Sequence, residues 1–367
     1  MKLDRLQLEL LRDFEGFFKF IRTWDFTQSL YIPYTMCADF TGNQRGKTAQ
    51  KARQYVLRIL GWHPLPKRNV TYFECPDHLS HDSIYHDFGD GVKEFLHYQG
   101  QYAPINVPPD GKCEYCRKDL RINERGSRVF RFCSQTLPGE TDTVGDDGTG
   151  QSAEVGNVVY PEFKKWLPAR YIKRDLTSRR SAITIADPLA GFKCGPNTYA
   201  GEDIIVEFVS YKQSMQRQAG VQRLSVWEDE EPPAEFHEEQ VPRVIREDGD
   251  ILLTLTPAQK MSWTYDEIFE SAKLFLRTDS VLKFIRETDD KNAKKVMRTD
   301  SKKDICIIQA STYDNPMFTK AEVDRHYFFS DPDTLATRCY GIFRQISGRI
   351  FPGFDKRVHI IDHARIV

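Results

Sequence analysis

The chain of 367 residues is long enough for one large α/β domain or two smaller ones. Its composition of 40% hydrophobic and 29% charged residues is ordinary for a globular protein, and no apolar run is long enough to span a membrane. The 52 Lys and Arg residues balance the 53 Asp and Glu residues, which argues against a strongly basic nucleic-acid binder. We therefore expect no membrane partner, and a DNA-binding surface would have to be a local patch.

The N-terminal residues alternate charge with leucine, which predicts an amphipathic helix rather than a signal peptide. A polar turn follows, where Gln28 either faces an adenine base or is simply solvated. The first core elements are then a strand, a helix and a second strand, at residues 34–40, 49–60 and 69–75. The pattern becomes irregular and rich in turn residues over residues 76–155, which we interpret as an insertion into the core fold.

A phosphate-binding loop is predicted between the first strand and the first helix. It departs from the pattern G-x-x-x-x-G-K-[ST] because Thr41 stands where the first glycine is expected. Loop N–H groups would surround the phosphates of ATP, Lys47 would reach the β- and γ-phosphates, and the Thr48 hydroxyl would bind Mg²⁺. The predicted nucleotide-binding residues are Gln28 and the whole loop: Thr41, Gly42, Asn43, Gln44, Arg45, Gly46, Lys47 and Thr48. The alternative is a plain helix cap without a ligand.

Regular structure returns after the insertion, with a helix at 160–171 that Pro168 interrupts and mostly helical segments at 264–298 and 319–345. Five segments have the composition of strands: 181–186, 203–210, 223–228, 250–256 and 304–310. Alternating strands and helices predict a mostly parallel central sheet with helices on both faces. Together with the loop, this indicates an α/β fold of the P-loop NTPase (RecA-like) type, in the branch with a glutamate base.

Carboxylates follow the strand at 223–228, where nucleotide-hydrolysing folds place the aspartate associated with Mg²⁺. We assign Asp229 to Mg²⁺ and Glu230 to the attacking water as the catalytic base. The register is open by one position because Glu228 and Glu231 flank this pair. The alternative is a solvated acidic turn after a strand.

Hydroxyl residues lie at the end of the next predicted strand, which is followed by Pro257. Thr254 and Thr256 would lie along the same sheet edge as the two preceding motifs, where open α/β sheets bind ligands. We predict that they couple the loss of the γ-phosphate to neighbouring segments. The alternative is an ordinary strand end with a proline stop.

The order of these three motifs resembles the large terminase subunit of tailed bacteriophages, the DNA-packaging motor. The resemblance runs from about residue 24 to the last residue and rests on several further segments. These are Val209-Ser-Tyr-Lys-Gln213, Val226-Trp-Glu-Asp-Glu-Glu-Pro-Pro233, Thr254-Leu-Thr-Pro257, Ala310-Ser-Thr-Tyr-Asp-Asn-Pro316, Gly348-Arg-Ile-Phe-Pro-Gly-Phe354 and His359.

The resemblance implies an ATP-hydrolysing motor that translocates double-stranded viral DNA into a procapsid in the host cytoplasm. The implied partners are the DNA, a portal protein, the small terminase subunit and further copies of the chain in a homo-oligomeric ring. The motif order also fits another P-loop nucleic-acid-dependent ATPase, such as a helicase, although helicase nucleic-acid motifs are not evident. A nucleotide-binding module without turnover would have no need of Glu230.

The resemblance also implies a division of the chain into an ATPase motor domain at 1–345 and a linker at 346–367 that begins a nuclease domain. Asp355 and Asp362 lie in this linker, but no later carboxylate completes a two-metal cluster. We therefore expect the nuclease domain to be absent from this chain and no nuclease activity.

Large terminases often carry an arginine inside the phosphate loop, because the transition state needs a positive charge against the γ-phosphate. Arg45 is the arginine of this loop, and it either acts on the phosphate as a catalytic residue or caps the loop. A neighbouring subunit could supply another, with Arg179, Arg180 and Arg217 as candidates between which the sequence does not choose.

The segment Cys113-x-x-Cys116 is half of a zinc site within the insertion. Cys133, Cys75, His78 and His81 are the candidates for the remaining two ligands. Because residues 100–150 have few apolar side chains for a core of their own, a zinc ion would explain how they are ordered. A second CxxC is missing, so free thiols and a solvated histidine turn remain the alternative.

Overall fold

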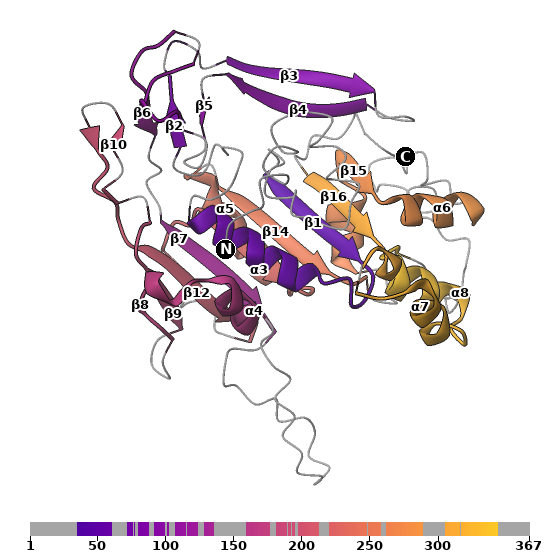
Figure 1. The fold of residues 1–367 in the computed structure, drawn as a ribbon. Coiled ribbons are helices and arrows are strands. Elements are labelled where there is room, and N and C mark those ends of the chain that lie inside the picture. Colours follow the sequence, from indigo (N-terminus) through magenta and orange to yellow (C-terminus); the bar gives the residue numbers. More distant parts are fainter. Residues whose placement is uncertain are drawn as a thin grey trace, which may run out of the picture.

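The computed structural model has a nine-stranded sheet at its centre (Figure 1). The structure describes residues 35–60, 72–75, 77, 80–87, 92–99, 101–102, 107–114, 116–123, 128–135, 159–176, 181–188, 190–191, 193–194, 197–212, 220–247, 249–257, 262–288, 305–315 and 317–343. Several residues singled out in the sequence lie outside this part: Gln28, His78, Arg179, Arg180, Arg217, Asp355, Asp362 and the segment 346–367, together with the side chain of His81.

The central sheet has the strand order β15-β16-β1-β14-β13-β7-β12-β9-β8. Neighbouring strands are parallel from β15 to β12, whereas β9 and β8 are antiparallel at one edge. In sheet order the strands are Leu274–Arg277, Ile305–Ala310, Met36–Thr41, Asp250–Leu255, Ser225–Asp229, Val129–Ser134, Ile204–Ser210, Ala182–Ile185 and Ile172–Arg174. This is the mostly parallel sheet that the alternation of strands and helices predicts.

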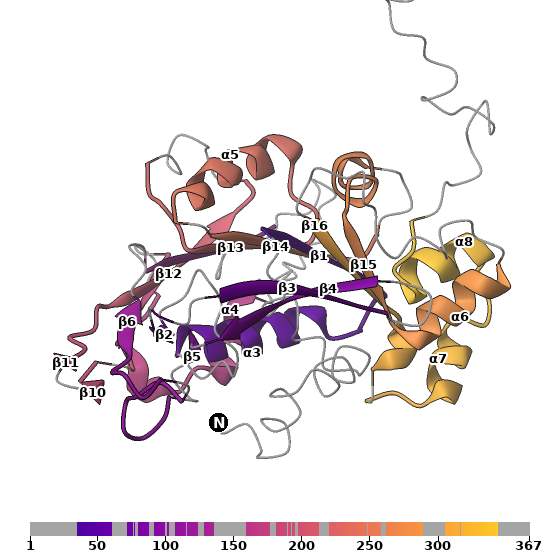
Figure 2. The same cartoon turned by 90° about the horizontal axis from the view of Figure 1, so that it is seen from above.

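Helices cover both faces of the sheet, which Figure 2 shows edge-on. The helices α3 (Lys47–Ile59) and α4 (Val159–Trp166) lie on one face, and α5 (Ala234–Ile245) lies on the other with a π-helical turn at Thr264–Phe269. Because both faces are covered, every residue of β1, β14 and β16 is buried. Continuous apolar strands of this kind are typical of parallel sheets.

An aromatic cluster fills the space between the sheet and the pair α3 and α4. The ring centroid of Phe132 lies 4.7 Å from Tyr55, 5.0 Å from Phe163 and 5.3 Å from Trp227. Its distance to Phe208 is 5.5 Å in an edge-to-face contact. Rings in this geometry stabilise a core beyond the area they bury, so the cluster ties α3 and α4 to three central strands.

A buried polar network fixes the C-terminal end of α3. The guanidinium Nη1 of Arg58 donates to Asp250 Oδ1 at 3.0 Å and to Oδ2 at 3.2 Å, and Ser225 donates its hydroxyl to the same carboxylate. The Tyr55 hydroxyl lies 2.8 Å from Ser225 Oγ. Because Asp250 and Ser225 begin β14 and β13, the network fixes the helix at the edge opposite to the phosphate loop.

The remaining elements lie around this core. A 3-10 turn (Thr312–Asp314), α6, α7, α8 and a second π-helical turn gather beyond β15 and β16 (Figures 1 and 2), the last four at Asp279–Glu287, Lys320–His326, Pro332–Thr334 and Leu335–Cys339. A 3-10 turn at Ala169–Tyr171 precedes β8. Small sheets pair β5-β2-β6 (Gln101–Tyr102, Tyr72–Glu74, Arg121–Asn123), β3-β4 (Ser80–Asp87, Val92–Gln99) and β10-β11 (Lys193–Cys194, Asn197–Thr198). In the described residues, no helix combines the length and apolar character that crossing a membrane requires.

Three expectations from the sequence need correction. The strand at 69–75 is β2, which belongs to a small sheet and not to the core. The range 76–155 contains β7, a strand of the central sheet, and 264–298 contains the strand β15. Both strands are short, and β7 is interrupted by Arg131, which hydrogen-bonds to Glu207 and Gln240 inside the protein and thereby hides the apolar pattern.

We expect Phe132→Ala to lower the free energy of unfolding by about 3–5 kcal/mol, because it removes the ring at the centre of the aromatic cluster. Phe329→Ala is the matched control: its ring is 95% exposed, and its loss should change stability by less than about 0.5 kcal/mol. Urea unfolding of both variants measures the difference. Equal effects would contradict the placement of β7 in the core.

Candidate nucleotide-binding site

The parallel register brings the three sequence motifs to one edge of the sheet. Thr254 of β14 pairs with Asp39 of β1 on one side and with Asp229 of β13 on the other. The phosphate loop follows β1 directly, and Glu230 follows β13. Side chains that lie far apart in the sequence therefore meet at the carboxyl ends of adjacent strands, the usual ligand position in such sheets.

The second half of the loop leads directly into α3. Gly46 has φ 88° and Gln44 φ 55°, so the chain turns through left-handed conformations before the helix begins at Lys47. The first N–H group to bond within the helix is that of Gln50, which donates to the Gly46 carbonyl at 3.0 Å. The N–H groups from Gly46 to Ala49 thus have no acceptor within the helix, which is the arrangement that binds anions at helix N-termini.

The first half of the loop is held by other parts of the protein. The N–H groups of Gly42 and Asn43 donate to the carbonyls of Ala310 at 2.9 Å and Arg338 at 2.6 Å. A Cβ atom on Gly42 would lie 2.1 Å from a carbonyl oxygen of Cys339, so this position requires glycine. Of the predicted nucleotide-binding residues, these two therefore use their N–H groups to position the loop, while Thr41 is buried at the end of β1.

Two polar side chains after β16 also support the loop. Thr312 donates its hydroxyl to the Asn43 carbonyl at 2.8 Å, and Asn315 donates its amide to the Gln44 carbonyl at 2.7 Å. The sequence analysis assigns them no role, although both stand in the segment 310–316 that carries part of the resemblance. Their position became evident only from the pairing of β16 with β1.

Lys47 connects the loop to the other two motifs. Its Nζ donates to Thr256 Oγ1 at 3.0 Å and lies 2.8 Å from Glu230 Oε1. The side chain of Lys47 is 12% exposed and that of Glu230 is 41% exposed, so solvent reaches this ion pair mainly from the carboxylate side. The cation, the hydroxyl and the carboxylate predicted for the site thus lie within direct contact.

Asp229 lies beside Thr48 at the bottom of the site. The Thr48 hydroxyl donates to Asp229 Oδ1 at 3.1 Å, and Thr254 donates to the same oxygen at 2.7 Å while accepting from Trp227 Nε1 at 2.9 Å. Burial raises the pKa of Asp229 to about 6, although Lys47 lowers it. A hydroxyl and a buried carboxylate side by side are the hard oxygen donors that Mg²⁺ prefers, so these residues fit that ion.

The backbone at Glu230 is strained. Its φ of 61° lies in the left-handed region, which a residue with a Cβ adopts only at a cost. The Glu230 N–H donates to the Thr254 carbonyl at 2.7 Å, and the Tyr211 hydroxyl lies 3.0 Å from the Asp229 carbonyl and 3.3 Å from that of Glu230. Strain held in place by such contacts is common at functional sites. Tyr211 stands in one of the segments of the resemblance, but the sequence analysis gives it no part in this support.

The two flanking carboxylates point elsewhere. Glu228 is fully buried and its Oε2 lies 2.8 Å from Nδ1 of His237 on α5. Glu231 accepts a hydrogen bond from Thr264 Oγ1 at 3.1 Å. Neither contacts the loop lysine in the described structure, whereas Asp229 and Glu230 face Thr48 and Lys47.

Arg45 is 1% exposed and lies under the loop rather than at its surface. It is near the buried pair of Lys51 and Asp39, whose Nζ and Oδ2 atoms are 2.7 Å apart. Burial raises the pKa of Asp39, and Lys51 and Arg45 act against this rise. In this conformation Arg45 contributes positive charge beneath the loop, and the sequence analysis did not foresee the pair.

The four cysteines predicted as zinc ligands separate into two places. Cys75, Cys113 and Cys116 come together in the small sheet. Cys133 lies in β7 of the central sheet, where it packs in the core with Val209 and Val226, so its selection as a zinc ligand was wrong. The physical reason is that β7 forms part of the core and not of the insertion.

Comparisons with known proteins give structural likenesses only. No family model matches the chain, and no curated protein is similar to it. A mutant of the large terminase ATPase domain from Thermus phage P74-26 has a TM-score of 0.46 and 13% identity, covering 94% of this chain and 95% of that domain. The large terminase from another phage, described as a thermophilic bacteriophage, has a TM-score of 0.47 and 13% identity, covering 97% of this chain and 57% of its own length.

The same thermophilic bacteriophage terminase in complex with ADP has a TM-score of 0.46 and 12% identity, covering 96% of this chain and 56% of that chain. This chain thus spans little more than half of the length of that terminase. Since all these identities and TM-scores are low, the function is argued below from the residues of the chain itself.

The pair of Glu228 and His237 predicts how stability depends on pH. Burial lowers the pKa of His237, but Glu228 outweighs this effect, so the pKa is raised above 6.5. The imidazolium therefore stabilises the fold fully below the unfolded pKa, and this contribution is lost as pH rises through the higher folded pKa. We expect the difference in free energy of unfolding between the wild type and Glu228→Gln to be larger at about pH 6 than at about pH 9. Urea titrations at both pH values measure it; a constant difference would contradict the assignment.

Proposed function

We propose that the chain binds ATP with Mg²⁺ and hydrolyses it, and that this hydrolysis drives the translocation of double-stranded DNA in viral genome packaging. ATP hydrolysis rests on one observation: the start of α3 presents Lys47 and Thr48 in direct contact with Glu230 and Asp229. A phosphate-binding cation, a metal-binding pair and a carboxylate base are the groups that nucleotide hydrolysis requires. A binding module without turnover would need only the first two.

Each side chain has a separate task in this reaction. The N–H groups from Gly46 to Ala49 and the ammonium of Lys47 bind the phosphates and stabilise the charge that develops on the γ-phosphate. Thr48 and Asp229 would hold Mg²⁺, which when bound neutralises charge on the β- and γ-phosphates. Glu230 orients a water for attack and accepts its proton.

The ion pair of Lys47 and Glu230 gives this site two states. When phosphates occupy the loop, they compete with Glu230 for the ammonium of Lys47, because an ammonium forms its strongest contacts with anions. The carboxylate, which is already 41% exposed, is then released to bind water. Nucleotide binding thereby prepares the base, and Thr256, which accepts a hydrogen bond from Lys47, senses the exchange from β14.

The proposal of a packaging motor rests on the motif segments quoted above for the resemblance to large terminases. The segments 209–213, 226–233, 254–257 and 310–316 all border the site, through Tyr211, Asp229, Thr256 and Thr312. Its partners would be DNA, a portal protein, a small terminase subunit and further copies of the chain in a ring, in the host cytoplasm. Arg45 is proposed as the arginine that moves from beneath the loop to the γ-phosphate.

We expect Glu230→Gln to lower ATP turnover by about a hundredfold or more while leaving nucleotide affinity nearly unchanged, because it removes the base but keeps the shape. Glu231→Gln is the matched control and should keep its turnover, since Glu231 contacts Thr264 and not the loop. Steady-state hydrolysis and binding of a fluorescent ATP analogue measure the two quantities. An inactive Glu231→Gln beside an active Glu230→Gln would shift the assignment by one residue.

Duplex DNA should stimulate ATP turnover more than single-stranded DNA of equal length, because a packaging motor moves along a duplex. Phosphate release with each DNA, at several salt concentrations, is the measurement, and Lys47→Ala provides the background without hydrolysis. Stimulation by single strands together with separation of a duplex would favour the helicase instead.

A further inference from the structure

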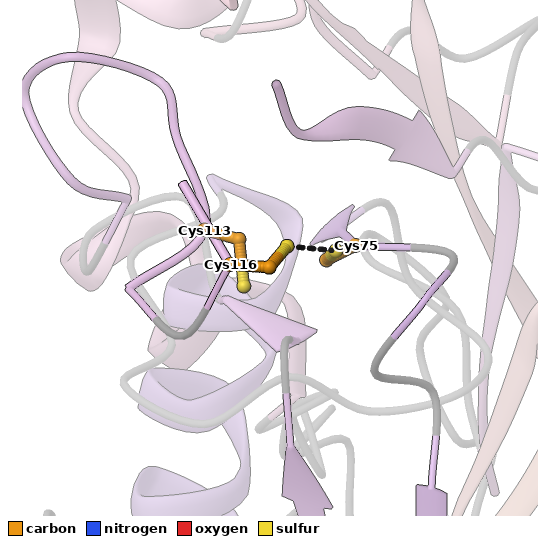
Figure 3. A group of neighbouring side chains, drawn as sticks. All are labelled: Cys75, Cys113 and Cys116. Carbon is orange, nitrogen blue, oxygen red and sulfur yellow. Dashed lines mark hydrogen bonds between the residues drawn. The ribbon is translucent and has the colours of Figure 1, made fainter. Parts of the chain in front are cut away.

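Three cysteine thiols meet in the small sheet β5-β2-β6, away from the nucleotide site (Figure 3). Cys75 follows β2, and Cys113 and Cys116 lie in the turn before β6. Their sulfur atoms all lie within 4.8 Å of one another, and those of Cys75 and Cys116 are 3.5 Å apart. All three are thiols in the described structure, and the 3.5 Å separation is far longer than a disulfide bond of about 2 Å.

From this cluster we propose that Cys75, Cys113 and Cys116 bind a structural zinc ion. Thiolates of a tetrahedral site lie about 2.3 Å from the metal, which places the sulfur atoms roughly 3.8 Å from one another. The observed separations of 3.5 Å and at most 4.8 Å therefore need only small adjustments of side chains. Three soft sulfur donors select zinc over Mg²⁺ or Ca²⁺.

The backbone around the cluster has the form of a metal-binding turn. The N–H of Cys113 donates to the Lys118 carbonyl at 2.8 Å, and the N–H of Arg117 donates to the Cys113 carbonyl at 2.9 Å. Arg117 has φ 61°, a left-handed conformation that bends the chain directly after Cys116 and brings this thiol back over Cys113. On the other strand, the backbone N–H of Asp77 donates to the sulfur of Cys75, which favours the thiolate.

The charges near the cluster suit a site with three thiolates. Three thiolates and one Zn²⁺ leave a net charge of about −1. Lys118 carries the opposite charge beside Cys75 and Cys116 and forms an ion pair with Asp77, and Arg117 pairs with Asp110. These pairs also hold the turn and the end of β2 together.

The small sheet has little else to stabilise it. Its buried cluster consists of Phe73, Leu120 and the thiols of Cys75 and Cys113, with Val107, Ile122 and Cys116 packed against them. A core of this size is too small to order a separate sheet by burial alone, and natural proteins of this kind use a metal or disulfides. A zinc ion that joins β2 to the turn at 113–116 would supply the missing stability.

The fourth ligand is nominated by the sequence alone. In the described part of the chain, no further His, Cys, Asp or Glu atom joins the three sulfur atoms. His78 stands three positions after Cys75, which repeats the spacing of Cys113 and Cys116, and it lies outside the described residues. A variant of His78 therefore tests this ligand separately from the three thiols.

The experiment is elemental analysis of the whole chain, expressed without added metal and purified without chelator. We expect about one zinc per chain, since a structural site of this kind holds one ion. Cys75→Ser, Cys113→Ser and Cys116→Ser should each lose most of it, whereas Cys133→Ser is the matched control and should retain it. His78→Ala should lose zinc during dialysis against a chelator that the wild type withstands, and full retention would overturn His78 as the ligand.

A second measurement does not depend on whether the variants fold. Wild-type protein in which Co²⁺ replaces zinc should show the visible absorption bands of a tetrahedral thiolate site. The proposal is overturned if the wild type contains less than about a tenth of a zinc per chain and its native Cys113 and Cys116 are freely alkylated. It is equally overturned if mass spectrometry shows a disulfide among the three cysteines.

Discussion

The register of β1, β14 and β13 is the constraint on which the nucleotide site depends. Because Thr254 pairs with both Asp39 and Asp229, the ends of the three strands lie level at one edge of the sheet. A shift of one residue would turn every side chain of the shifted strand to the opposite face. The contact of Thr48 with Asp229, over 181 positions of sequence, exists only in this register.

The same edge concentrates features that oppose stability. Asp39, Lys51, Arg45 and Asp229 are all buried there, and removing charges from water costs free energy even when they are paired. The raised pKa of Asp229 shows that its pairing does not fully offset that cost, and Glu230 adds backbone strain. Proteins tolerate such conflicts mainly where function requires them. The aromatic cluster and the Arg58–Asp250 network lie on the opposite side of this balance, because they hold α3 rigidly behind the loop.

The small sheet and the central sheet are stabilised by different means. The central sheet is covered on both faces and buries long apolar strands, so burial alone can order it. The sheet β5-β2-β6 has a core of a few residues, and its three thiols occupy the place that larger apolar side chains fill in the central sheet. Chemistry at the two places is therefore separable: hard oxygen donors lie at the nucleotide site and soft sulfur donors in the small sheet.

Local patterns in the sequence determined the strand-loop-helix unit at 34–60, five further core strands and the placement of Lys47, Thr48, Asp229 and Glu230 near one another. These follow from apolar runs, from glycine and from the fixed geometry of a parallel sheet edge. Only the tertiary structure decided which carboxylate faces the loop, because Glu228 and Glu231 are chosen by His237 and Thr264, partners distant in sequence from β13 or on another element.

The tertiary structure likewise placed β7 in the core and separated Cys133 from the other thiols, since strand order depends on contacts far apart along the chain. It also assigned Tyr211, Thr312 and Asn315 to the support of the site through hydrogen bonds to carbonyls. A backbone carbonyl leaves no trace in the sequence, because every residue has one.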